Sequence, residues 1–278
     1  MKPRIAIPLP HGADPEYAQR AIPQYERAVE LSGGEPVRIP LDRTPAEVMK
    51  LIERCDAVLL PGSKADVDPA KFGATRLPKT EAADPKRDTV DELLLQDAYN
   101  MRKPVLGICY GLQILNVYRS GTLVQHIESA VNHEAGRKVA VAHSVEIVPG
   151  SRLAEILESW ETSLGEVSGK GTSSTRTEQP STHDRALAPE GRLVIPANSS
   201  HHQSADVIGD GLRVVAQCPD DGIIEGLEGT SPDHFVVAVQ WHPERSFDDD
   251  ERSRKIFQAL VEAATQKHEE LVGEFEGR

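Results

Sequence analysis

Short apolar runs alternate with amphipathic segments over the first part of the chain. Each run is long enough for one buried strand, and the runs span residues 4–9, 37–40, 56–61 and 105–108. Between them, apolar positions recur at helical spacing over residues 16–31, 45–54 and 88–101. Strands that alternate with helices predict a parallel sheet with helices on both faces, and ligands of such sheets bind where the strands end.

The predicted helices carry recognisable start and stop signals. Thr44 is expected to cap the second helix, because a proline follows it and Glu47 can complete a capping box. Asp88 is expected to cap the third helix. A fourth helix should follow Cys109 and continue to about Ser120, where a glycine stops it.

The second half of the chain is rich in predicted strands and poor in helical spacing. Its β-like runs span residues 139–148, 193–196, 212–218, 223–227 and 235–241. A final amphipathic helix should begin at Asp248 or Asp249 and continue to about Leu271. Residues 166–191 are rich in Ser, Thr, Gly and Pro and lack apolar periodicity, so we expect a flexible surface loop within 160–191. The whole chain, 1–278, is interpreted as one domain.

Composition and charge narrow the classes of partner and the compartment. The 278 residues carry a formal net charge of -13, which argues against nucleic acid and anionic membrane surfaces as partners. The longest apolar runs are too short to cross a bilayer, and the N-terminus has no signal-peptide pattern, so we expect a cytoplasmic protein. The three cysteines, Cys55, Cys109 and Cys218, form neither a disulfide framework nor a zinc pattern.

Cys109 lies where the fourth apolar run meets the next helix, in the stretch GICYGLQ. Gly107 and Gly111 flank it, which leaves room for neighbouring backbone at a sharp turn. This G-x-C-x-G pattern is the cysteine form of the nucleophile elbow, and the following helix N-terminus favours a thiolate over a thiol. Most free cysteines are instead small buried hydrophobic residues, so the hypothesis requires a base near Cys109.

The stretch QWHPE offers that base at the end of a predicted strand. His242 would accept the proton of Cys109, and Glu244 would hold the imidazole and stabilise its charged form. An isolated HPE would more simply be a surface turn. The presence of both motifs in one chain favours a catalytic triad of Cys109, His242 and Glu244.

GICYGLQ followed far downstream by QWHPE closely resembles the class I glutamine amidotransferases, which use a Cys-His-Glu triad. Further segments are similar to one branch of them, the γ-glutamyl hydrolases of the peptidase C26 type: LPGS at 60–63, DVDP at 66–69, NSSHHQ at 198–203 and DGIIE at 221–225. The nearest named activity in that branch is γ-glutamyl-γ-aminobutyrate hydrolase. The resemblance implies an α/β fold, a flavodoxin-like three-layer sandwich with a mostly parallel central sheet and extra antiparallel strands in the C-terminal half.

The resemblance also implies an oxyanion hole beside the triad. Backbone N–H groups of Tyr110 and of the loop formed by Gly62 and Ser63 would stabilise the tetrahedral intermediate. The branch often has arginine where this chain has Tyr110, and a second glycine is common where this chain has Ser63. These departures leave the triad unchanged and leave the identity of the amine leaving group open.

Four residues are implied to bind the substrate: Gln113, Ser199, Ser200 and His201. Gln113 lies one helical turn beyond the nucleophile, and a cap or core hydrogen bond would explain it equally well. The resemblance requires no metal and no cofactor. His201 and His202 would point to opposite faces of a strand, which makes them poor joint metal ligands.

The resemblance implies a cysteine-dependent hydrolase that cleaves a γ-glutamyl amide bond through a γ-glutamyl thioester. The substrate would be a small γ-glutamyl molecule, and homo-oligomerisation stays open. An alternative with the same chemistry is a glutaminase subunit that supplies ammonia to a separate synthase. Two further hypotheses are an unrelated α/β-hydrolase, in which the acid normally precedes the histidine, and a non-catalytic protein that keeps the fold.

Overall fold

A computed structural model describes residues 2–165, 187–188 and 192–276 of the chain. Its strands are β1 (Arg4–Pro8), β2 (Glu35–Ile39), β3 (Ala57–Leu60), β4 (Val105–Ile108), β5 (Leu123–Val124), β6 (His143–Ile147), β7 (Leu187–Ala188), β8 (Arg192–Ala197), β9 (Ser204–Ala205), β10 (Leu212–Gln217), β11 (Ile224–Gly229) and β12 (Val236–Val239). Its helices are α1 (Pro15–Leu31), α2 (Pro45–Ile52), α3 (Pro85–Met101), α4 (Tyr110–Tyr118), α5 (Arg152–Gly165), α6 (Pro243–Ser246) and α7 (Glu251–Glu276), with a 3-10 turn at Pro69–Phe72. None of the helices in these ranges is long and apolar enough to cross a membrane.

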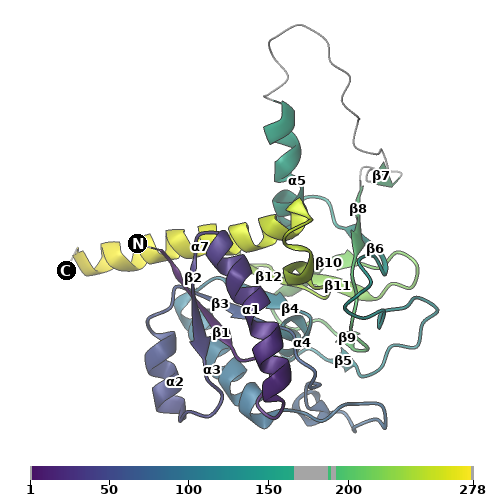
Figure 1. Cartoon of the computed structure of the whole chain (residues 1–278), viewed down its shortest axis with the longest axis horizontal. Helices are drawn as coiled ribbons and strands as arrows, with labels where there is room; N and C mark the ends of the chain where they lie inside the picture. The colour runs from purple at the N-terminus through teal and green to yellow at the C-terminus, as the bar shows by residue number, and fades with distance from the viewer. Residues whose placement is uncertain (1, 166–186, 189–191, 277–278) are drawn as a thin grey trace, which may run out of the picture.

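Most of the strands join one large sheet, in the order β2-β1-β3-β4-β12-β11-β10-β6-β8-β7 (Figure 1). The strands from β2 to β12 in this order are mutually parallel, and the rest of the sheet is antiparallel. The order 2-1-3-4 followed by one further parallel strand is that of the flavodoxin-like sheet. The predicted fold class is therefore confirmed, with the antiparallel strands forming the C-terminal half of the sheet.

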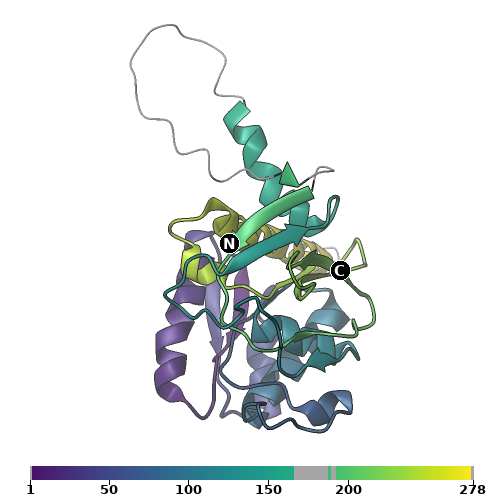
Figure 2. The same cartoon turned by 90° about the vertical axis from the view of Figure 1, so that its right-hand side faces the viewer.

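Helices cover both faces of the sheet and create two apolar cores (Figure 2). Successive residues of β1 face opposite cores: Ile5 and Ile7 pack in the core that includes α1 and α7, whereas Ala6 packs in the core that includes α2, α3 and α4. The inner strands β3, β4 and β12 are therefore buried at every position and carry no polar side chain, whereas the edge strand β2 carries Glu35 and Arg38. Because apolar cores cover both faces of the sheet, a ligand site has to form at the ends of the strands.

Several predicted boundaries are wrong. The cap of α3 is Asp84, whose carboxylate accepts hydrogen bonds from the backbone of the first turn, and Asp88 lies inside the helix. The helix α5 and the short β5–β9 pair were not predicted, and α7 begins at Glu251. The ends of the predicted loop 160–191 belong to α5 and β7, and the remainder of that prediction lies outside the described residues. The predicted capping box at Thr44 is confirmed.

The turn from β4 into α4 depends on glycines at two positions. A Cβ atom added to Gly111 would lie 2.1 Å from the carbonyl oxygen of Leu60 in β3, and one added to Gly107 would lie 2.8 Å from the backbone of Gly111. Between them, Cys109 has φ 54° and ψ -105°, a conformation that few residues other than glycine adopt. The flanking glycines are therefore required by close backbone packing, as the sequence predicted.

Replacement of Gly111 by alanine should destabilise the protein although alanine favours helices. The clash with backbone that cannot move aside should lower the free energy of unfolding by about 3 kcal/mol. Gly150→Ala is the matched control, because Gly150 has φ 69° and open space around it, so only about 1 kcal/mol of conformational strain is expected. Urea unfolding of both variants measures the difference. A Gly111→Ala variant as stable as the wild type would contradict the packing argument.

Candidate active site

Cys109 lies at the carboxyl end of the parallel strands, at the first turn of α4. Its backbone N–H donates to the carbonyl of Val239 at 2.9 Å, which ties the end of β4 to the end of β12. The side chain is 5% exposed. The same strand, β12, leads directly to His242 and Glu244, so the sheet brings the two motifs to one edge.

His242 and Glu244 form a buried pair at the entrance to α6. The distance from His242 Nδ1 to Glu244 Oε1 is 2.8 Å, and His242 Nε2 has no hydrogen-bond partner within the described ranges. Asn198 holds the backbone of His242 from both sides, since its Oδ1 accepts the His242 N–H and its Nδ2 donates to the His242 carbonyl, each at 3.0 Å. The imidazole is thus oriented by the carboxylate and leaves one ring nitrogen available.

Gly62 lies between the histidine and the cysteine. A Cβ atom added to Gly62 would lie 3.1 Å from His242 Cε1 and 3.6 Å from Cys109 Cβ. The imidazole and the thiol therefore line the same small space, as the predicted triad requires. Glycine is needed at this position because any side chain would enter that space.

The resting proton distribution differs from the sequence prediction. Burial raises the pKa of Cys109 to about 12, although Arg245 and a hydrogen bond from the backbone of Tyr110 act in the opposite direction. Burial also lowers the pKa of His242 below its usual value. Burial by itself would raise the pKa of Glu244, but His242 and Arg245 outweigh it and hold that pKa below the usual range. Burial therefore favours a thiol and a neutral imidazole in the resting protein, against the thiolate expected from the helix N-terminus.

The oxyanion hole was expected to combine the Tyr110 N–H with an N–H of the Gly62–Ser63 loop, and these N–H groups differ in their present partners. The Tyr110 N–H donates to the Cys109 sulfur at the start of α4. The Gly62 N–H donates to the hydroxyl of Tyr25 at 3.1 Å, so it is already engaged. The Ser63 N–H has no partner in the part of the chain that the structure describes. Of the predicted loop, Ser63 is thus the residue that can offer a donor.

Arg87 is fully buried and fixes the ends of two strands beside Cys109. Its Nε lies 2.8 Å from both carboxylate oxygens of Asp91, one helical turn later in α3. Its Nη1 donates to the carbonyl of Pro10 at 3.1 Å, and its Nη2 donates to that of Pro61 at 2.9 Å. Pro61 directly precedes Gly62, so the buried ion pair holds this loop against the end of β1.

Tyr110 connects the nucleophile turn to α3. Its hydroxyl donates to Asp88 Oδ1 at 2.7 Å, and the guanidinium of Arg87 lies 5.0 Å from the centre of its ring. That distance is within the range of a cation–π contact. The residue after the nucleophile therefore has a structural role through its side chain, whereas its backbone N–H lies beside the reacting sulfur, where it can also reach an oxyanion.

A cavity of about 580 Å³ contains seven of the ten predicted site residues in its lining: Ser63, Cys109, Tyr110, Gln113, Ser200, His201 and His242. Its wall carries five basic side chains, Arg20, Lys64, Lys79, Arg137 and Arg245, against three acidic ones, Asp66, Glu81 and Glu134. Lys64, Lys79 and Arg245 are paired with carboxylates outside the lining, whereas Arg20 and Arg137 have no acidic partner among the described residues. These two cations favour an anionic ligand. Volumes of this size are typical of small-molecule sites.

The predicted substrate-binding residues are divided between the cavity and the surrounding structure. The Gln113 amide lines the cavity, but its Nε2 donates to the carbonyl of Gln203 at 3.1 Å. Ser199 is outside the lining, and its hydroxyl donates to the carbonyl of His133. Ser200 accepts a hydrogen bond from Arg245 at 2.7 Å. His201 faces the cavity, but its ring nitrogens lie against Gln203 and Glu225.

Sequence reasoning assigned no role to Asn198, Arg245 or Arg87. Asn198 belongs to the quoted NSSHHQ segment, and Arg245 directly follows HPE, so proximity to the motifs was the available signal. No local pattern indicates that Arg87 reaches the ends of β1 and β3. Its position follows only from the tertiary packing of α3.

The fold and the cysteine turn define the chain as a class I glutamine amidotransferase-like protein. Its sequence matches the Peptidase C26 family over residues 9–244, and the chain therefore belongs to that family. Membership supports an enzyme of the hydrolase or amidotransferase type.

Some relatives are named as glutamine amidotransferases and others as γ-glutamyl-γ-aminobutyrate hydrolases. A Mycobacterium tuberculosis protein named as a glutamine amidotransferase is 35% identical over 245 residues, which are 87% of this chain and 66% of that protein. A glutamine amidotransferase-like protein of Rickettsia prowazekii is 30% identical over 265 residues, with 90% of each chain covered. The γ-glutamyl-γ-aminobutyrate hydrolase PuuD of Escherichia coli (strain K12) is 27% identical over 250 residues, 86% of this chain and 84% of PuuD.

Two solved structures share the fold at low identity. A Thermoplasma acidophilum protein described as one subunit of GMP synthase has a TM-score of 0.58 and 13% identity, and 97% of each chain is covered. The structure of PurLQS from Thermotoga maritima gives a TM-score of 0.53 and 19% identity, with 94% of this chain and 99% of that chain covered. These similarities support the fold alone.

The raised pKa of Cys109 predicts how alkylation depends on pH. Because only the thiolate reacts, the rate with iodoacetamide should rise roughly tenfold per unit between about pH 7 and 9, without a plateau. Peptide mass spectrometry separates Cys109 from Cys55 and Cys218, and free glutathione is the control thiol. Rapid alkylation of Cys109 that is independent of pH below neutrality would contradict the neutral resting pair.

The Arg87–Asp91 pair predicts a separation of stability from activity. Arg87→Met leaves the Asp91 carboxylate buried without its partner and should destabilise the protein by about 3–5 kcal/mol. Arg87→Met/Asp91→Leu should recover most of that loss in urea unfolding. Turnover should stay low in both variants, because the carbonyl of Pro61 remains unanchored beside Gly62. Full activity of the double variant would show that Arg87 does not position the loop.

Proposed function

We propose that the protein is a cysteine-dependent hydrolase that cleaves the amide bond of small γ-glutamyl compounds. The observation that carries this proposal is the cavity lined by both Cys109 and His242, with Glu244 buried behind the imidazole and basic side chains in the cavity wall. A γ-glutamyl group carries an α-carboxylate, which such a wall attracts. The names of the relatives agree with this chemistry.

Acylation begins with the neutral thiol. Cys109 Sγ attacks the δ-carbonyl carbon while its proton passes to His242 Nε2, and Glu244 stabilises the imidazolium that forms. The N–H groups of Tyr110 and Ser63 stabilise the tetrahedral oxyanion, and the loss of one such donor typically costs about 3 kcal/mol. The intermediate expels the amine, which takes the proton from His242, and leaves the γ-glutamyl group as a thioester on Cys109.

Deacylation uses the same groups in reverse order. A water molecule attacks the thioester carbonyl and gives one proton to His242. The second tetrahedral intermediate releases glutamate as the carbon–sulfur bond breaks, and the sulfur recovers its proton from His242. Atoms and charges balance over the cycle, and the residues of the cavity supply every proton transfer.

Recognition of the glutamyl group depends on the cations of the wall. Arg20 has no acidic partner within the described residues, whereas Lys64 is paired with Asp14 and Arg245 contacts Glu244. Arg20 is therefore available for a substrate carboxylate at the rim of the cavity. A leaving amine that itself carries a carboxylate, such as γ-aminobutyrate, suits the additional positive charge better than ammonia does.

The alternative is a glutaminase that supplies ammonia to a synthase. It uses the same acyl-enzyme chemistry, and several relatives are named after glutamine amidotransferases. The cations of the cavity wall favour the hydrolase, because the amide nitrogen of glutamine carries no second carboxylate for them to bind. Substrate preference separates the two functions.

Glutamate release from glutamine, γ-glutamyl-γ-aminobutyrate and a γ-glutamyl dipeptide tests the proposal. The protein alone should hydrolyse one of the latter two with a kcat/KM at least about tenfold above that for glutamine, which corresponds to a difference of about 1.4 kcal/mol in barrier. Cys109→Ala should reduce this turnover by roughly 10³-fold or more, because the nucleophile is lost. Cys55→Ala is the matched control and should retain it, since Cys55 is buried away from the cavity.

Two outcomes would overturn the assignment. Turnover of glutamine alone would favour the ammonia-supplying alternative. Turnover that survives Cys109→Ala would exclude the covalent mechanism altogether.

A further inference from the structure

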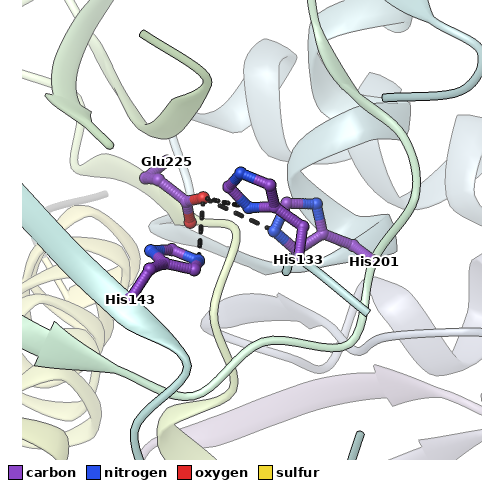
Figure 3. A group of neighbouring side chains, drawn as sticks. All are labelled: His133, His143, His201 and Glu225. Carbon is purple, nitrogen blue, oxygen red and sulfur yellow. Dashed lines mark ion pairs between the residues drawn. The ribbon is translucent and has the colours of Figure 1, made fainter. Parts of the chain in front are cut away.

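Three histidines and one glutamate meet in the interior beside the cavity (Figure 3). His133 follows β5, His143 begins β6, His201 precedes β9, and Glu225 lies in β11. All four side chains are 0–2% exposed. Four segments of the chain thus place three imidazole nitrogens and one carboxylate around one point.

The spacing of these atoms fits ligands of a metal ion better than hydrogen-bond partners. His133 Nδ1 lies 3.3 Å from Glu225 Oε1, and the Nε2 atoms of His143 and His201 each lie 3.4 Å from the same oxygen. None of these contacts qualifies as a hydrogen bond. The edge of a tetrahedron around zinc is about 3.3–3.6 Å, because zinc binds these ligands at roughly 2.0–2.2 Å.

The outer ring nitrogens fix which atoms face inward. The Nδ1 atoms of His143 and His201 lie 3.2 Å and 2.9 Å from the backbone carbonyls of Ser144 and Gln203, respectively. A carbonyl can only accept, so both of these histidines carry a proton on Nδ1. In the neutral imidazole, Nε2 then presents a lone pair.

His133 repeats this arrangement with its nitrogens exchanged. Its Nε2 lies 2.9 Å from Asp221 Oδ2, which leaves Nδ1 facing Glu225. Partners of this kind orient the histidine ligands in most protein metal sites. Lone pairs of three histidines that converge on a carboxylate repel one another unless protons or a metal ion lie between them.

We propose that His133, His143, His201 and Glu225 bind one zinc ion, or a closely similar divalent transition metal. Three imidazoles and one carboxylate suit zinc, whereas calcium and magnesium prefer oxygen ligands alone. Four protein ligands in a buried position complete a tetrahedral shell, which is the arrangement of structural zinc sites. The metal therefore has a structural role and takes no part in the hydrolysis.

The metal would join the antiparallel half of the sheet to one wall of the cavity. His133 and His201 belong to the two loops that also carry the cavity residues Glu134, Arg137 and Ser200. These loops are already linked, because the His201 N–H donates to the carbonyl of His133 at 2.9 Å. The ion anchors both loops to β6 and β11 and so keeps this wall in place.

Among the histidines, the sequence prediction of no metal considered the adjacent pair His201 and His202. The side chains of this pair do diverge, since His202 lies 3.1 Å from Asp66 and His201 faces Glu225. The other ligands come from distant segments, and no spacing in the sequence connects them. A second cluster, formed by His133, Cys218 and Asp221, shares one histidine and has only three ligands.

Metal analysis of the full-length protein, purified after growth with added zinc, tests the proposal. We expect about one zinc ion per chain by plasma mass spectrometry. Removal by dipicolinate should lower Tm, and added Zn²⁺ should restore it. Cobalt bound to the stripped protein should show the visible absorption of a tetrahedral site without a thiolate charge-transfer band.

Variants assign the ligands. His143→Gln and Glu225→Gln should each lower the zinc content to less than about a tenth of an ion per chain. His202→Gln, Cys109→Ala and Cys218→Ser should retain it, because these residues lie outside the proposed shell. His202→Gln is the matched control for a neighbouring histidine.

Three results would overturn the proposal. A wild-type protein that contains no zinc, and whose Tm does not respond to added Zn²⁺, would leave the cluster as a network held by protons. Loss of zinc from Cys109→Ala would place the ion at the nucleophile, and loss from Cys218→Ser would place it in the second cluster. The wild-type measurements decide even if a ligand variant fails to fold, and none of them depends on turnover.

Discussion

The contact between Gly111 and the carbonyl of Leu60 is the constraint on which the site depends. It lets the first turn of α4 approach β3 so closely that no side chain fits between them. Cys109 is thereby held in a strained turn at the edge of the sheet, with the N–H of Tyr110 at its sulfur. The next strand in the sheet, β12, ends at the same edge and delivers His242. The nucleophile and its base therefore meet because of backbone packing in the parallel sheet.

Burial then sets the chemistry of the pair. A thiol whose pKa is raised to about 12 and a histidine whose pKa is lowered do not form a resting ion pair, so proton transfer accompanies attack on the substrate. Two buried groups keep the arrangement in place: Arg87 at the ends of β1 and β3, and Asn198 on the backbone of His242. The surrounding structure thus holds the desolvated thiol and imidazole in place. The cations of the cavity wall attract an anionic substrate.

The sequence was sufficient where chemistry is carried by short motifs and local signals. The parallel half of the sheet and the cap at Thr44 were predicted from residue patterns, and the motifs around Cys109 and His242 were interpreted together with the family resemblance. It was insufficient where distant segments meet. The helix α5 is amphipathic but was not predicted. The cap of α3 was predicted at Asp88, one turn after the actual cap at Asp84. The cluster around Glu225 arises from four segments that only the folded sheet brings together.

A common acyl-enzyme is the central claim of the account, and partition with hydroxylamine tests it most directly. Hydroxylamine competes with water for the thioester on Cys109, so hydrolysis in its presence should yield γ-glutamyl hydroxamate as well as glutamate. The ratio of these products should be the same for every γ-glutamyl substrate that the protein turns over, because the amine has left before the partition. A ratio that varies with the amine, or turnover without any hydroxamate, would contradict a γ-glutamyl thioester intermediate.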